Sequence, residues 1–109
     1  SQAIRAGNLL FVSGQIPLNP KSMEIVSEDP AQQANQCLLN IKAIVEQSGL
    51  SMDHIVKCQI FLKDMSHFGS VNEVYGKFFK EPYPTRATVE VARLPKDVQV
   101  EIDAIAVFE

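Results

Sequence analysis

Residues 84–102 read PTRATVEVARLPKDVQVEI and are the most informative part of the chain. Residues 85–93 and 98–107 alternate apolar with polar side chains, which is the pattern of half-buried β-strands. The short LPKD connection between them predicts that the second strand folds back on the first as a hairpin-like pair. In that arrangement Arg86, at the start of one strand, lies roughly opposite the low 100s, where the next strand carries Glu101.

Arg86 and Glu101 are the strongest candidates for chemistry, because charged groups in half-buried strands are unfavourable unless they are paired or used. One interpretation is a cross-strand salt bridge. The other has the planar guanidinium of Arg86 bind a carboxylate, while Glu101 orients a water or moves a proton. The spacing alone does not choose between these two interpretations.

Three more strands are predicted upstream, at residues 2–6, 9–13 and 54–63. The second of them ends at Ser13-Gly14. This pair is interpreted either as a strand-ending turn or as a hydroxyl and a bare backbone offered to a ligand.

Two helices are predicted between the strands. Asp29 followed by Pro30 is a strong helix start, because aspartate caps free N–H groups and proline fits the first turn. Apolar residues at helical spacing then continue for about 19 residues, to Gly49. Ser66 is expected to cap the second helix. That helix carries a stripe interpreted as core, made of Phe68, Val71, Val74, Tyr75, Phe78 and Phe79.

These elements predict a single domain over residues 1–109 in the order ββ-α-β-α-ββ. The fold class is α+β, with one sheet and two helices packed on one of its faces. Apolar residues on both faces of the last two strands indicate that the open face packs against another copy of the chain. Glu90 and Arg93, on one predicted strand, are interpreted as a solvated face or a subunit contact.

Composition argues against two classes of partner. The net charge is −3, from 10 basic and 13 acidic residues, and the basic residues are scattered, which argues against nucleic acid. No apolar run approaches the roughly 20 residues that a membrane helix needs.

Cysteines and histidines give no sign of a metal site. Cys37 and Cys58 lack metal-ligand or disulfide spacing and are expected to be buried small hydrophobes in a reducing compartment. His54 and His67 stand at the starts of elements, where we expect solvated or capping roles. We therefore expect no metal and no cofactor, and a cytoplasmic protein, with a mitochondrial location left open.

Four segments in order resemble the RidA (YjgF) family of imine/enamine deaminases. They are SGQIP at 13–17, NIKAI at 40–44, VNEVY at 71–75 and the block at 84–102. The resemblance implies a chorismate-mutase-like fold with a single mixed sheet, assembled as a homotrimer with sites in clefts between subunits. It also implies hydrolysis of 2-iminobutanoate and 2-iminopropanoate, released as enamines by PLP-dependent dehydratases, to 2-keto acids and ammonia, with no PLP or metal in the deaminase itself.

Site residues follow from the resemblance position by position. Arg86 is similar to the arginine that grips the substrate carboxylate, and Glu101 to the glutamate that positions the attacking water. Ser13 and Gly14 match a Ser-Gly pair that lines the pocket. Asn72 matches a helix asparagine near the cleft.

The chain departs from the family pattern at two places. Thr88 falls where bacterial members often carry a cysteine; the family contact there is largely through the backbone, so activity is expected without a thiol role. Family members also carry a Gly-Pro-Tyr segment just before the residues that match 1–3, and its tyrosine contributes to the cleft. A protein that truly lacks this tyrosine is expected to have weakened activity.

Three other functions remain as alternatives at this stage. The same cleft would serve a non-catalytic module that binds keto acids or other small carboxylates. A ribonuclease or translation inhibitor is disfavoured by the acidic balance and by the absence of a catalytic histidine pair. A chaperone-like surface role is not addressed by the sequence.

Overall fold

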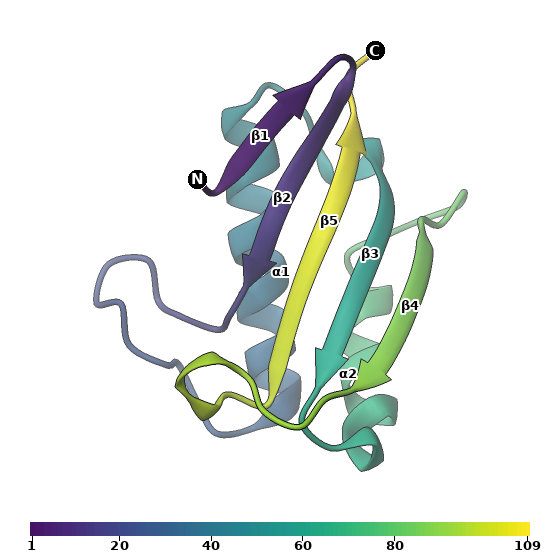
Figure 1. Ribbon diagram of the computed structural model, residues 1–109. Coiled ribbons are helices and arrows are strands. Elements are labelled where there is room, and N and C mark those ends of the chain that lie inside the picture. Colours follow the sequence, from purple (N-terminus) through teal and green to yellow (C-terminus); the bar gives the residue numbers. More distant parts are fainter.

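The structure, a computed structural model, describes residues 1–109 as one mixed five-stranded sheet with two helices packed on one face (Figure 1). The predicted α+β class and the element order are confirmed. The strands are β1 (Ala3–Ala6), β2 (Leu9–Gln15), β3 (Ile55–Leu62), β4 (Thr85–Glu90) and β5 (Val100–Val107), and the helices are α1 (Pro30–Gln47) and α2 (Phe68–Gly76).

The predicted hairpin between the last two strands is wrong. The strand order is β1-β2-β5-β3-β4, so β3 lies between β4 and β5 (Figure 1). β4 pairs with β3 in parallel, after a crossover through α2, whereas every other pair is antiparallel. The connection after β4 passes the end of β3, where Val91 N–H donates to Leu62 O and Lys63 N–H donates to Gln99 O.

α1 begins and ends as its signals predict. The Asp29 side chain accepts a hydrogen bond from Gln32 N–H at the helix start, and Pro30 occupies the first turn. Ser48 follows the last helical residue, and Gly49 then adopts a φ of +86°, a conformation that favours glycine. The prediction of this helix is confirmed to within a residue.

The start of α2 differs from the prediction, because Ser66 is not its cap. Asp64 is the capping residue, and it accepts from Ser66 N–H at the start of a 3₁₀ turn, Met65–His67. α2 then continues from Phe68 without a side-chain cap at His67. His54 does cap, since its Nδ1 accepts from Ser51 N–H. The Nδ1 of His67 is instead buried without a partner.

The core lies between the helices and the sheet, and β5 runs through its middle. Val100, Ile102, Ala104 and Ala106 are all buried on the helix side of the sheet. The open face is also partly apolar, so both faces of the last two strands carry apolar residues, as predicted. Ile4, Phe11 and Ile105 are cross-strand neighbours on it, and Val89 stands beside Phe61.

The buried amide of Gln33 and the two buried cysteines are accommodated in this core. Gln33 is 1% exposed, and its amide donates to Ser27 O and accepts from Gln99 N–H, which ties the chain before α1 to the start of β5. Cys37 and Cys58 are both free and fully buried, as predicted. Burial raises the pKa of the Cys58 thiol to about 11.

Neither helix has the length and apolarity needed to cross a membrane.

Candidate functional site

Arg86 stands on the edge strand β4, on the side of the sheet that faces α2. Its neighbour across the parallel ladder is Cys58, which is fully buried in the core. One guanidinium nitrogen, Nη1, donates to Asn72 Oδ1. The guanidinium carbon lies 4.9 Å from the centre of the Tyr75 ring and 5.4 Å from that of Phe68. Each distance is within the range of a cation–π contact.

No carboxylate of the chain pairs with this guanidinium. The three ion pairs of the structure join Lys42 to Glu46, Lys80 to Asp53 and Arg93 to Asp97. The guanidinium of Arg86 has five N–H donors, and Asn72 accepts from one of them. The remaining donors are free to bind an anion. An exposed arginine without a carboxylate partner is able to bind an anionic ligand.

Glu101 lies against Gly14, where β2 departs from regular pairing. The register of β2 with β5 shifts between Val12 and Gln15. A Cβ atom added to Gly14 would lie 2.9 Å from the Glu101 carboxyl carbon and would overlap Oε2. A glycine is therefore needed for the carboxylate to occupy this place. Ser13 is exposed beside it, and its hydroxyl accepts from the Gln15 amide.

The environment of Glu101 favours its protonated form. Partial burial raises the pKa of the Glu101 carboxyl above its ordinary value, and the nearby Asp103 carboxylate raises it further. Burial likewise raises the pKa of Asp103. A carboxylate with a raised pKa is a stronger base at neutral pH than an ordinary one, which suits it to take a proton from water.

Within one chain, Arg86 and Glu101 do not meet. Arg86 stands in the same row as Cys58 and Ala104, while Glu101 is three residues along β5 from Ala104. An odd number of residues reverses the face, so Glu101 points away from the helices and Arg86 toward them. Two strand spacings and three residues of rise separate their backbones by about 14 Å. The predicted cross-strand salt bridge between them is therefore wrong.

The other predicted residues divide between these two places. Asn72 joins Arg86, and Ser13 and Gly14 join Glu101. Thr88 lies two residues beyond Arg86 on the same face of β4. Its hydroxyl is buried without a hydrogen-bond partner. Sequence reasoning missed Phe68 and Tyr75 as neighbours of Arg86. The available signal was Asn72, a polar residue that lies between them at helical spacing.

The remaining charged and titratable groups have local roles. Glu90 accepts from Met65 N–H, and Arg93 pairs with Asp97 at 2.7 Å on the exposed loop before β5. His54 and His67 flank opposite ends of the eight-residue β3, roughly 26 Å of strand apart, so they form no acid–base pair in one chain. No three His, Cys, Asp or Glu side chains gather closely enough to hold a metal ion.

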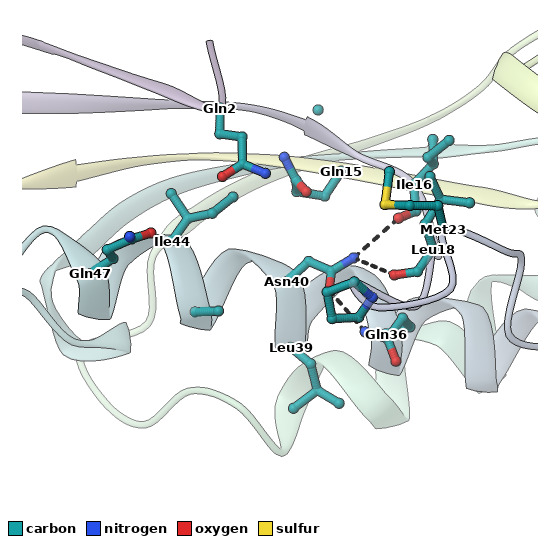
Figure 2. Close-up of a pocket in the computed structure, with 13 residues that line it drawn as sticks. Gln2, Gln15, Ile16, Leu18, Met23, Gln36, Leu39, Asn40, Ile44 and Gln47 are labelled. Atoms are coloured by element: carbon teal, nitrogen blue, oxygen red, sulfur yellow. Dashed lines mark hydrogen bonds between the residues drawn. The ribbon is translucent and has the colours of Figure 1, made fainter.

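The largest cavity of the chain lies between α1 and the loop after β2, away from Arg86, and Gly14 is among the residues that line it (Figure 2). Its volume is about 480 Å³. Asn40 fixes one wall, because its amide donates to the carbonyls of Ile16 and Leu18, as Figure 2 shows. Its polar side chains are uncharged amides, those of Gln2, Gln15, Gln36, Asn40 and Gln47. Without a cation, this cavity does not offer the recognition of an anion that Arg86 offers.

Replacing Gly14 with alanine tests the contact with Glu101. We expect Gly14→Ala to fold with an unfolding free energy within about 1 kcal/mol of the wild type, because the atoms that clash are at the mobile end of a side chain. The Glu101 carboxyl should move, which its carbon-13 resonance would report. Gly76→Ala is the control, since a Cβ there meets nothing within 4 Å. An unshifted carboxyl resonance in Gly14→Ala would contradict the contact.

The raised pKa of Glu101 predicts a pH-dependent stability. Its protonated form stabilises the fold fully below the ordinary carboxyl pKa of about 4.3, and this contribution is lost as pH rises through the higher pKa of the folded state. Glu101→Gln cannot ionise, so its Tm relative to wild type should be higher at about pH 7.5 than at about pH 3.5. Glu73→Gln, at an exposed position, controls for the lost charge. A Tm difference independent of pH would refute the prediction.

Comparisons with known proteins show the family of the chain. The model of the Endoribonuclease L-PSP family matches residues 1–108. A RutC family protein of Pyrococcus horikoshii is 54% identical, over 100% of this chain and 86% of the relative. The 2-iminobutanoate/2-iminopropanoate deaminase of Escherichia coli is 52% identical, over 97% of this chain and 84% of the relative. The crystal structure of E. coli TdcF with bound serine superposes with a TM-score of 0.93 at 49% identity, over 99% of this chain and 87% of that one. On these matches, the chain belongs to the Endoribonuclease L-PSP family, also called RidA or YjgF.

Proposed function

We propose that this protein is an imine deaminase that hydrolyses 2-iminobutanoate and 2-iminopropanoate to the 2-keto acids and ammonia. The observation that carries the proposal is the unpaired guanidinium of Arg86, held by Asn72 with most of its donors free. The substrate has a carboxylate next to an imine carbon, which is the anion that such a fork binds in bidentate fashion. The 52% identity to the E. coli deaminase supports the same reaction.

We propose that each site is shared between two copies, in a homotrimer. Arg86 and Glu101 of one chain lie on opposite faces of the sheet, so a small substrate touches both only if they come from different chains. The open face that carries Glu101 also exposes apolar surface, with Phe11 43% and Val89 45% exposed. Three copies related by a closed rotation would cover this face and bring the Arg86 edge of one to the Glu101 face of the next.

In this mechanism Arg86 fixes the substrate carboxylate and Glu101 acts on water. The carboxylate of Glu101 accepts a proton as the water oxygen bonds to the imine carbon. The C=N electron pair moves to nitrogen, which takes up that proton and leaves Glu101 ionised again. The carbinolamine that results then collapses. Its hydroxyl proton is transferred to the nitrogen by way of Glu101, the C=O bond forms and the C–N bond breaks, releasing ammonia. Water is the only co-reactant. Gly14 leaves room for the glutamate, and Ser13 offers an exposed hydroxyl group beside it.

A binding module for small carboxylates is the second candidate. The structure of TdcF with bound serine, similar over nearly the whole chain, favours a carboxylate ligand in this fold. Both candidates use Arg86, but only the enzyme needs Glu101. A measurement of turnover therefore distinguishes the two candidates.

We further propose a cytoplasmic location, since both buried cysteines are free, as in a reducing compartment.

Removing the guanidinium should abolish deamination without unfolding the protein. We expect Arg86→Ala to lose the bidentate contact, worth about 1.5–3 kcal/mol as a charged hydrogen bond, and to lower kcat/KM at least tenfold. A threonine dehydratase would generate the imine in situ, and semicarbazide would trap what the protein does not hydrolyse. Arg93→Ala, an exposed arginine on the neighbouring loop, is the control. Near-normal turnover in Arg86→Ala would refute the proposed role of Arg86 in deamination.

Mixing two inactive variants tests whether the site is shared. Arg86→Ala and Glu101→Gln, refolded together at equal concentrations, should recover about a quarter of wild-type activity, because a random trimer then places an intact Arg86 beside an intact Glu101 at one site in four. Each variant refolded alone provides the baseline. If both residues acted from the same chain, the mixture would show only the sum of the two residual activities.

A further inference from the structure

We infer that Phe68 and Tyr75 are positioning residues, which hold the Arg86 guanidinium in place for the substrate carboxylate. This inference rests on the proposed function. Phe68, Asn72 and Tyr75 are spaced at i, i+4 and i+7 on α2, so they share one face of the helix. Arg86 contacts all three, with one hydrogen bond and two ring contacts.

The problem that these residues solve is the freedom of a long side chain. Arg86 is exposed and stands on an edge strand, where no neighbouring strand confines it. An unrestrained arginine loses rotamer entropy when it binds a ligand, which weakens binding. Rings on one side of the guanidinium restrict it beforehand and shield that side from water. The donors not used by Asn72 are left for the ligand.

Tyr75 is rigid enough to act as such a support. It is 6% exposed and belongs to the hydrophobic core, and its ring packs against Phe79 with centroids 4.7 Å apart. Its hydroxyl has no partner at normal hydrogen-bond geometry. The Cys58 thiol is nevertheless close enough to interact with this hydroxyl, and Cys58 is the neighbour of Arg86 across the ladder of β3 and β4. Burial raises the pKa of this hydroxyl, so it stays neutral. The ring, rather than a charge on oxygen, is what Arg86 contacts.

Phe68 is the better position to test, because it is only partly buried at the edge of the core. Phe68→Leu keeps an apolar side chain and removes the ring, and Phe68→Tyr restores a ring. Phe78→Leu is the matched control, because Phe78 is also a partly buried aromatic residue packed against the core, and Arg86 is not stacked on it. Tyr75→Phe and Tyr75→Leu repeat the comparison at the buried ring.

Nuclear magnetic resonance of the ligand-free protein gives a readout independent of activity. The Arg86 side-chain protons should be shifted upfield by the ring currents of Phe68 and Tyr75. We expect that shift to shrink in Phe68→Leu, to return in Phe68→Tyr and to be unchanged in Phe78→Leu. It should also survive Tyr75→Phe. An unchanged Arg86 shift in Phe68→Leu would overturn the inference, whether or not the protein proves to be a deaminase.

Binding of 2-oxobutanoate, the keto-acid product, gives the functional readout without turnover. We expect Phe68→Leu to weaken its Kd about two- to fivefold, as the loss of one cation–π contact implies, and to raise KM for the imine with little change in kcat. In an Arg86→Ala background, Phe68→Leu should have no further effect on Kd, because the ring acts through Arg86. An equal effect in both backgrounds would show a direct or merely structural role and overturn the proposal.

Discussion

The insertion of β5 between β2 and β3 is the constraint on which the rest of the structure depends. The strand forms ladders on both edges and buries every second side chain against α1 and the core. The same alternation sends Glu101 and Asp103 to the opposite face, where partial burial raises the pKa of each carboxyl. One strand therefore supplies both the centre of the core and the acidic residues of the proposed site. A shift of one residue in the register of β5 would send its apolar side chains to the open face and its carboxylates into the core.

The position of Arg86 follows from the same constraint. Because β5 takes the place beside β3, the strand that precedes it in sequence is left to pair on the far side of β3, in parallel. That pairing needs a crossover, which α2 provides, and α2 is thereby brought against the strand whose arginine it supports. The half of the proposed site that contains Arg86 is thus a product of topology. It is complete in a single chain, whereas a site that contains both charged residues is not.

Much of the fold was predictable because its signals are local. Asp29 and Pro30 announce the start of α1, and the alternation in residues 98–107 marks a strand. The partners of strands are not local. Lys96 lies in the turn between the last two strands and has a φ of +55°. The sequence predicts a hairpin at this turn, because a tight turn between two alternating segments usually joins paired strands. Here that turn carries the chain past the end of β3. The pairing of Arg86 with Glu101 failed for the same reason. The contact of Gly14 with Glu101 was not predicted, because it depends on the pairing of β2 with β5, which local sequence does not show.

The order of strands also bears on how the chain is made. β5 follows the other four strands in the sequence, yet it is the central strand of the sheet (Figure 1). During synthesis β2 and β3 leave the ribosome before β5, so the edges of these two strands that face β5 have no partner at first. The sheet can close only after β5 itself has emerged, which makes its formation a late, non-local step. A chain interrupted before β5 would expose two unpaired strand edges, which are templates for aggregation.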